Sequence, residues 1–205
     1  MESKKITVPR LQAMKQRDER ITMVTCYDAT FARLLDAAGV EMLLIGDSLG
    51  MVIQGHTTTV PVTLDDILYH TKNVARVRPN AHIMADMPFM SYQASTVQAI
   101  GNAGRLLKEA GAESVKVEGG EELVDTVAAM VRAGIPVMAH IGLKPQRVHQ
   151  MGGYKIQGRD RAGADQLLAE AKSFQGAGAF GLKLECVAME VAAEITRAVA
   201  NPTIW

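Results

Sequence analysis

Short apolar runs recur along the chain, and most of them end at a polar or acidic residue. They cover residues 42–45, 82–86, 114–118, 137–140 and 181–185. Continuous apolar residues over so short a length predict strands buried on both faces, as in a parallel sheet. Residues 21–26 predict a further strand before them, and residues 202–205 open another after them. The predicted strands therefore deliver polar groups, several of them acids, to one rim of the sheet.

Segments with helical spacing separate these strands. The helices are predicted at about residues 8–20, 29–38, 64–77, 96–110, 121–133, 162–175 and 189–200, and residues 48–63 and 142–159 predict loops. Thr63 and Asp66 form a capping box before one helix. Gly39, Gly111 and Gly134 follow the C-termini of three others. These local signals support the predicted alternation of strand and helix.

The alternation amounts to six strand and helix units and the start of a seventh. It requires parallel strands, either in an open doubly wound sheet or in a (βα)8 TIM barrel. Acids at successive strand ends favour the barrel, whose chemistry gathers at the carboxyl ends of its strands. We therefore predict an α/β fold with one incomplete TIM-barrel domain over residues 1–205. It has about six and a half units and an N-terminal helix at about 8–20.

The length of the chain bears on how far this barrel closes. A TIM barrel takes about 250 residues, whereas this chain has 205. If the seventh and eighth strands are incomplete, the edges of the first and sixth strands have no partner. We then expect a chain that associates through its open edge or has low stability. We also expect little catalytic activity unless the missing part is supplied.

Composition narrows the partner to a small molecule. The 22 basic and 22 acidic residues cancel, and neither sign forms a long run, so the pattern favours neither nucleic acid nor an anionic membrane. Cys26 and Cys186 fit no metal or redox spacing, which predicts reduced thiols that pack as small apolar residues. Because no signal-peptide core and no membrane span is recognisable, we expect a cytoplasmic protein.

Three acids suggest a metal site at the rim. Asp47, Asp86 and Glu118 supply hard oxygen ligands from the ends of three strands, and Mg²⁺ accepts such ligands while keeping waters. Any one of these acids could equally cap a helix or pair with a lysine. Their recurrence on one rim favours the metal site. His56 and His140, at or near the rim, are weaker candidates for substrate binding.

Two further strands carry candidates for catalysis. Lys116 and Glu118 are two residues apart on one strand, so both face the barrel interior. A buried lysine needs a counter-anion, which is either Glu118 or a substrate carboxylate. Glu185 is the best candidate for a proton-abstracting base, because it follows an apolar strand in a dry position that raises its affinity for a proton. The alternative is a structural salt bridge with Lys183 or another rim cation.

Several long motifs resemble the ketopantoate hydroxymethyltransferase family. They are LIGDSLGMVIQGH at 44–56, ADMPFMSY at 85–92, VKVEGG at 115–120, GLKPQ at 142–146, GGYKIQG at 152–158 and LECV at 184–187. The motifs occur in order over nearly the whole chain, so the resemblance is highly specific. It implies a (βα)8 barrel of the phosphoenolpyruvate/pyruvate superfamily, a decameric homo-oligomer and the first committed step of pantothenate synthesis.

The resemblance also implies roles for the rim residues. Asp47 and Asp86 would bind Mg²⁺ directly, and Glu118 would complete the metal site directly or through water. Ser48 and Lys116 would hold the carboxylate of a 2-oxo acid, with Asp86 also close to it. The substrate-binding set is therefore Asp47, Ser48, Asp86 and Lys116.

The implied reaction joins 3-methyl-2-oxobutanoate and 5,10-methylenetetrahydrofolate. Mg²⁺ chelated by the 2-oxo acid polarises its carbonyl group, and Glu185 removes the C3 proton. The enolate then attacks the methylene carbon carried by the folate. Three residues depart from the family pattern: Lys144 for Thr, Ala188 for Pro, and Lys183 for an apolar residue. A charge at Lys183, inside the barrel, has to be paired or hydrated.

Two other functions remain open at this stage. One is a Mg²⁺-dependent carbon-carbon lyase or mutase of the same superfamily, which predicts turnover of a dicarboxylate or a phosphonate without folate. The other is a truncated, non-catalytic binding subunit that keeps ligand sites. Titration with substrate and metal, together with a turnover assay, separates the three.

Overall fold

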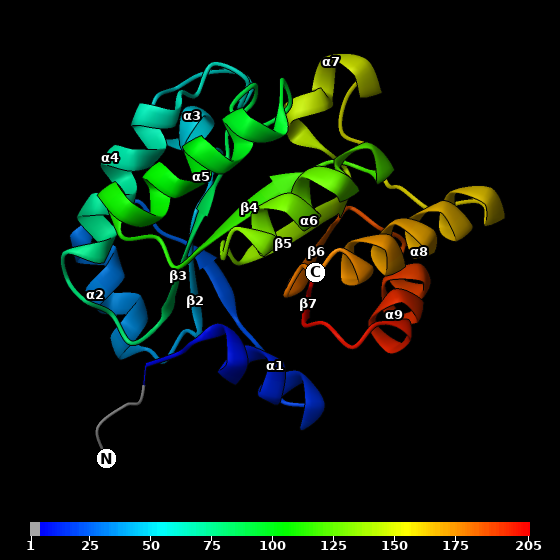
Figure 1. Cartoon of the computed structure of the whole chain (residues 1–205), viewed down its shortest axis with the longest axis horizontal. Coiled ribbons are helices and arrows are strands. Elements are labelled where there is room, and N and C mark those ends of the chain that lie inside the picture. Colours follow the sequence, from blue (N-terminus) through cyan, green and yellow to red (C-terminus); the bar gives the residue numbers. More distant parts are fainter. Residues whose placement is uncertain (1–4) are drawn as a thin grey trace.

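Seven parallel strands form one sheet in the computed structural model, which describes residues 5–205. In chain order they are β1 (Met23–Thr25), β2 (Met42–Ile45), β3 (His82–Asp86), β4 (Ser114–Glu118), β5 (Val137–Gly142), β6 (Gly181–Glu185) and β7 (Thr203–Ile204). Each strand pairs with the next one in the chain, which is the order of a TIM barrel. The sheet curves around a central axis (Figure 1). The predicted α/β barrel is confirmed.

The longer helices cover the outer face of this sheet (Figure 1). They are α2 (Ala29–Ala37), α4 (Leu64–Ala75), α5 (Thr96–Ala110), α6 (Val124–Arg132), α8 (Arg161–Gly176) and α9 (Met189–Ala198). Helix α5 has its predicted bounds, and α4 begins with the predicted capping box of Thr63 and Asp66. No helix within residues 5–205 is long and apolar enough to cross a membrane.

Short helical segments occupy regions that were predicted differently. The predicted loops contain α3 (Leu49–Val52), η2 (Pro145–Arg147) and α7 (Val148–Met151). The helix predicted at 121–133 begins as a separate 3-10 turn, η1 (Glu121–Leu123). These segments lie beyond the carboxyl ends of the strands. They therefore shape the rim rather than the body of the barrel.

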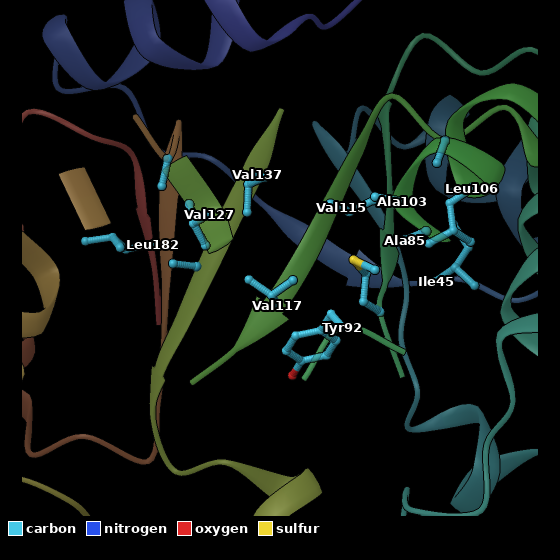
Figure 2. Close-up of a cluster of buried hydrophobic side chains, with 14 of the residues drawn as sticks. Ile45, Ala85, Tyr92, Ala103, Leu106, Val115, Val117, Val127, Val137 and Leu182 are labelled. Atoms are coloured by element: carbon cyan, nitrogen blue, oxygen red, sulfur yellow. The ribbon is translucent and has the colours of Figure 1, made fainter. Parts of the chain in front are cut away.

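Side chains alternate across each strand, so the sheet separates two apolar clusters. The larger cluster lies between sheet and helices and includes Ile45, Ala85, Val115, Val117, Val137 and Leu182. Figure 2 shows part of it, with Val115 and Val117 along β4 and Tyr92 close to Val117. The smaller cluster lies inside the barrel and includes Met42, Leu44, Met84, Met138 and Phe180. The alternate positions of each strand thus point toward the barrel axis.

Helix α1 (Val8–Gln16) closes the N-terminal end of the barrel interior. Its buried residues are Leu11 and Met14, as predicted, and both pack with Ile6 in the inner apolar cluster. The helix is shorter than the predicted 8–20. The chain leaves the helical conformation at Asp18, where φ is 55°. In Figure 1, α1 lies below the strands, on the side opposite α3 and α7.

The two edge strands, β1 and β7, are short. Within residues 5–205 each pairs with a single neighbour, β1 with β2 and β7 with β6. A cavity of about 550 Å³ reaches both edges, and its lining includes Lys15, Thr22, Thr203 and Trp205. The described sheet is therefore a nearly closed barrel with one seam.

Candidate active site

A cavity of about 340 Å³ opens at the carboxyl ends of the strands. It is lined by every predicted site residue: Asp47, Ser48, Asp86, Lys116, Glu118 and Glu185. The wall also includes His140 and Lys183, which the sequence placed at the rim or inside the barrel, and Thr59, Pro145 and Tyr154, which the structure adds. The structure therefore brings the predicted site together in one place, where TIM barrels carry their active sites.

The strongest charged contact in this cavity joins Asp86 and Lys116. They are opposite each other in the register of β3 and β4, and Lys116 Nζ lies 2.8 Å from Asp86 Oδ1. The other oxygen, Asp86 Oδ2, accepts the backbone N–H of Asp47 at 3.0 Å. The sequence analysis offered Glu118 or a substrate carboxylate as the counter-anion of Lys116. Within the described residues the ion-pair partner of Lys116 is Asp86 rather than Glu118, because the strand register places Asp86 beside the lysine. The substrate carboxylate as a further partner stays a prediction.

Gln146, in η2 after β5, connects two of the acids. Its Nε2 donates to Asp47 Oδ2 and to the Met87 carbonyl, both at 2.9 Å. Its backbone N–H donates to Glu118 Oε1 at 3.1 Å. In the described part of the chain, Glu118 Oε2 has no hydrogen-bond partner although it is buried. One loop residue therefore holds carboxylates that come from two different strands.

Tyr92 and Gln93 set the orientation of the Gln146 amide. The Tyr92 hydroxyl lies 2.8 Å from Gln146 Oε1 and 2.8 Å from the Glu118 carbonyl oxygen. It also accepts the backbone N–H of Glu118 at 3.2 Å. Gln93 Nε2 donates to Gln146 Oε1 at 3.0 Å. Because donors surround Oε1, the amide nitrogen of Gln146 faces Asp47.

Burial and crowding change the proton affinity of the carboxylates. Burial raises the pKa of Asp47 to about 7, and the charge of Asp86 adds to this rise. Burial raises the pKa of Glu118 to about 8, despite Lys116 and with contributions from Asp47 and Asp86. Burial alone would lower the pKa of Lys116, but Asp86, Glu118 and Asp47 together raise it, so the lysine stays charged. Three buried carboxylates therefore share one buried cation.

Glu185 is more accessible than predicted. Its side chain is 32% exposed, so the expected dry position was wrong. The neighbouring strand β7 pairs with Leu182 and Lys183 and stops before Glu185, which leaves this side of the carboxylate uncovered by the described sheet. His140 Nε2 lies 3.5 Å from Glu185 Oε2, and Lys183 Nζ lies 3.7 Å from it. Glu185 thus faces the cavity between an imidazole and an ammonium group.

His140 is a buried link between Lys116 and Glu185. Its Nδ1 lies 3.1 Å from Lys116 Nζ. Burial, followed by the charge of Lys116, lowers the pKa of His140 well below its ordinary value, so the ring is neutral. An ammonium group only donates, so Nδ1 accepts and the ring proton lies on Nε2, toward Glu185. His56, the other histidine candidate, is exposed and does not line the cavity.

Ser48 is held at the cavity wall by a local arrangement. Its Oγ lies 2.7 Å from the Tyr27 hydroxyl, and His70 Nδ1 donates to the Tyr27 carbonyl at 2.8 Å. The turn before it requires glycine, since a Cβ on Gly46 would lie 2.8 Å from Ser48 Oγ. On the other side of the cavity, Cys186 follows Glu185 and is exposed, whereas a packed thiol was predicted.

The donors in the cavity fit a divalent ion bound mainly through water. Within residues 5–205 no group of three or more His, Cys, Asp or Glu side chains is placed to hold a metal ion. Mg²⁺, however, usually takes one or two protein carboxylates and keeps several waters. The donor set here consists of the oxygens of three acids around one lysine and includes the unpartnered Oε2 of Glu118. Two direct carboxylate ligands and a third through water are compatible with this set.

The fold and its acidic mouth, the cavity at the carboxyl ends of the strands, define an α/β barrel with the layout of a TIM-barrel enzyme. A solved 2,3-dimethylmalate lyase, a member of the PEP mutase/isocitrate lyase superfamily, matches with a TM-score of 0.68 at 17% identity, over 98% of this chain and 73% of that chain. A solved complex of phosphonopyruvate hydrolase with oxalate and Mg²⁺ matches with a TM-score of 0.66 at 14% identity, over 87% and 63%. At such identities the likeness shows the fold alone.

Sequence similarity then narrows this class. The chain belongs to the ketopantoate hydroxymethyltransferase family, whose model matches residues 5–205. A protein of Moorella thermoacetica named 3-methyl-2-oxobutanoate hydroxymethyltransferase is 54% identical over 200 residues, which cover 98% of this chain and 74% of that protein. The chain is therefore of the transferase class of enzymes, and it spans about three quarters of the length of this relative. The resemblance found in the sequence motifs is confirmed.

Sequence reasoning missed the supporting residues of the site. Gln146 and Tyr92 were not singled out, although each ends one of the family motifs, at 142–146 and 85–92. No sequence pattern indicated a role for Tyr27. The position of Gln146 and Tyr92 inside motifs was the available clue, because a residue that holds a reactive carboxylate is constrained as tightly as the carboxylate itself.

Proposed function

We propose that this chain transfers a hydroxymethyl group from 5,10-methylenetetrahydrofolate to 3-methyl-2-oxobutanoate, giving 2-dehydropantoate with the help of Mg²⁺. The observation that carries the proposal is the convergence of three buried carboxylates and one buried lysine in the mouth of a barrel of this family. The name of the Moorella relative supports the choice of substrate. The decameric homo-oligomer stays a prediction from the family resemblance, and the cytoplasmic location stays a prediction from the sequence.

In this proposal Asp47 and Asp86 would hold Mg²⁺ directly, and Glu118 would complete the site directly or through water. When bound, the ion polarises the 2-oxo group of the substrate and stabilises negative charge on its oxygen. The solved phosphonopyruvate hydrolase complex, which has this fold and contains Mg²⁺ and oxalate, a small dianion, supports this type of ligand. Gln146 keeps Asp47 and Glu118 in place when no ion offsets their repulsion.

Lys116 and Ser48 bind the substrate carboxylate. Lys116 has three donor protons, of which Asp86 and His140 take two, so the third is available to a carboxylate oxygen. Ser48 adds a hydroxyl whose position is set by Tyr27. The lysine therefore orients the 2-oxo acid, so that the end opposite its carboxylate lies toward β6.

Glu185 accepts the C3 proton of the bound substrate. Glu185 Oε2 lies 3.5 Å from His140 Nε2 and 3.7 Å from Lys183 Nζ, so these two groups hold the carboxylate at the cavity. In balance, both C–N bonds of the folate methylene group break, and the carbon gains bonds to C3 and to the oxygen of a water molecule. The C3 proton and one water proton end on the two folate nitrogens.

A hydrogen-exchange assay tests the role of Glu185. Glu185→Gln is expected to slow exchange of the substrate C3 hydrogen with deuterated water by about 10²–10⁴-fold, while the Kd for 3-methyl-2-oxobutanoate changes less than twofold. Glu190→Gln, an exposed glutamate on α9, is the matched control and leaves the exchange rate unchanged. A wild-type exchange rate in Glu185→Gln favours the salt bridge with Lys183 as the sole role of this residue.

Product analysis separates the proposed reaction from its alternatives. Formation of 2-dehydropantoate by the chain, however slow, is expected to require methylenetetrahydrofolate. Turnover of a dicarboxylate or a phosphonate without folate would indicate a lyase or mutase instead. Binding of substrate and metal with neither activity would indicate a binding subunit.

A further inference from the structure

The segment that carries Gln146 is held by charged contacts outside the active-site cavity. Lys144 and Arg147 flank Gln146 on its two sides in the chain. Lys144 Nζ lies 3.9 Å from Glu170 Oε1, and the guanidinium group of Arg147 pairs with Glu122. None of these four charged residues, the outer cluster, lines the cavity at the carboxyl ends of the strands. The residue roles proposed so far leave the outer cluster unused.

Glu170, on α8, is the most buried member of the outer cluster. It is 5% exposed, and Gln166 Nε2, one turn earlier on the same helix, donates to its Oε1 at 3.1 Å. Its Oε2 has no hydrogen-bond partner within residues 5–205. Burial raises the pKa of Glu170, and the charge of Lys144 opposes this rise. The contact between the two side chains therefore ties α8 to the segment after β5.

Gly120, in the turn after β4, lies against the same contact. A Cβ at this position would lie 2.7 Å from Glu170 Oε1 and 3.1 Å from Lys144 Nζ, so glycine leaves the space that the pair occupies. The backbone N–H of Gly120 donates to Glu122 Oε1 at 2.9 Å. The outer cluster thus joins three parts of the rim, which are the turn after β4, the segment after β5 and helix α8.

Gln146 connects the position of this segment to the acids of the cavity. Its Nε2 donates to Asp47 Oδ2 at 2.9 Å, and its backbone N–H donates to Glu118 Oε1 at 3.1 Å. Hydrogen bonds of this type have lengths of about 2.7–3.2 Å, so a shift of the segment by about 1 Å would break both. In the proposed function these two acids belong to the Mg²⁺ site. A change in the outer cluster would therefore reach the metal through Gln146.

We propose that Glu170 is a positioning residue for the Mg²⁺ site. Through Lys144 it fixes the segment after β5. Gln146, on that segment, then holds Asp47 and Glu118 in place. The inference rests on the proposed function, because it takes these two acids as metal-binding groups. It also gives a role to Lys144, one of the three departures from the family pattern.

Hydrogen exchange and calorimetry on two variants test this role. Glu170→Gln and Lys144→Met each remove one charge of the pair with little change in volume. In the metal-free protein, exchange of the Gln146 backbone N–H with deuterated water is expected to become about tenfold faster in each variant, because its segment opens more often. The Kd for Mg²⁺ is expected to rise by about tenfold, as for loss of a residue that orients metal ligands.

Two controls separate positioning from a loss of overall stability. Exchange of the Met42 backbone N–H should keep its wild-type rate, because its hydrogen bond to the Thr22 carbonyl lies at the N-terminal end of the barrel. Glu109→Gln removes one charge of an exposed ion pair with Arg105 on α5. It should change the Gln146 exchange rate and the Kd for Mg²⁺ by less than about twofold.

The outcomes distinguish this role from the metal site itself. The proposal is overturned if both variants keep the wild-type exchange rate at Gln146, if Gln146 and Met42 exchange faster alike, or if both variants bind Mg²⁺ with wild-type affinity. Faster exchange at Gln146 alone, in a protein whose wild-type form binds no Mg²⁺, would support control of the segment by Glu170 and refute the metal site of the proposed function.

Discussion

The two ends of the barrel interior are built on the same strands but have opposite chemistry. At the N-terminal end, α1 packs onto inward-facing apolar residues, which include Met42, Met84 and Met138. Two positions further along β3 and β5, the inward-facing residues are Asp86 and His140, both of them buried. A step of two residues keeps a side chain on the same face of a strand. One such step is enough to change an apolar core into a polar site.

This difference indicates that the two ends of the barrel interior have different roles, one in stability and the other in chemistry. Burial of apolar side chains stabilises the N-terminal end, at about 25 cal/mol per Å² of apolar surface removed from water. A buried ion pair, by contrast, rarely stabilises a fold relative to apolar residues of similar size. The mouth needs Gln146 and Tyr92 to hold carboxylates that would otherwise repel one another. We therefore infer that the N-terminal end carries the stability that the mouth lacks.

Breaking the ion pair at the mouth is expected to have the largest effect on stability. Asp86→Ala leaves the buried Lys116 without its 2.8 Å partner, which should lower the free energy of unfolding by about 3–5 kcal/mol. The same change removes a direct ligand and should abolish measurable Mg²⁺ binding. Urea unfolding and calorimetry measure the two effects. Asp65→Ala is the control, because this exposed aspartate pairs with Arg105 at the surface and should cost less than about 1 kcal/mol.

Truncating a buried apolar side chain at the N-terminal end should lower the free energy of unfolding nearly as much, without changing ligand binding. Leu11 is fully buried in the inner apolar cluster, so Leu11→Ala should lower the free energy of unfolding by about 2–5 kcal/mol. The Kd values for Mg²⁺ and 3-methyl-2-oxobutanoate should stay within twofold of the wild-type values at a temperature where the variant is folded. A large loss of substrate affinity would show that the two ends are coupled rather than separate.

A smaller effect concerns the pH dependence of the N-terminal end. Burial lowers the pKa of His82 to about 4 from 6.5, where Glu113, Lys5 and Ser114 surround the ring. As pH falls below 6.5 the unfolded state binds a proton before the folded state does, so this group removes stability between pH 6.5 and about 4, by at most about 3 kcal/mol. His82→Asn should flatten that part of the curve in unfolding measurements at several pH values. An unchanged slope would mean that His82 is not neutral when folded.

The strands, and the acids at their ends, could be predicted because they depend on local patterns. Alternation alone placed Lys116 and Glu118 on one face, and both line the cavity. The bounds of α5 followed from its spacing and from Gly111, which adopts a left-handed φ of 81°. Such features require knowledge of only a few neighbouring residues. They could therefore be predicted from the sequence.

Contacts between distant segments could not be predicted in the same way. The partner of Lys116 depends on the register of β3 against β4, which no local pattern determines. Gln146 reaches Asp47 from a loop whose helical turns were missed. The two basic side chains near Glu185 come from two different strands, His140 from β5 and Lys183 from β6. Each of these properties belongs to the assembled barrel rather than to a single element.

The most direct test of the division between the two ends is to give the mouth the chemistry of the N-terminal end. In the double variant Asp86→Leu/Lys116→Met, an apolar pair replaces the buried ion pair. We predict a free energy of unfolding equal to or higher than that of the wild-type chain, with no binding of Mg²⁺ or 3-methyl-2-oxobutanoate. A double variant as unstable as Asp86→Ala, or one that still binds the 2-oxo acid with wild-type affinity, would contradict the account.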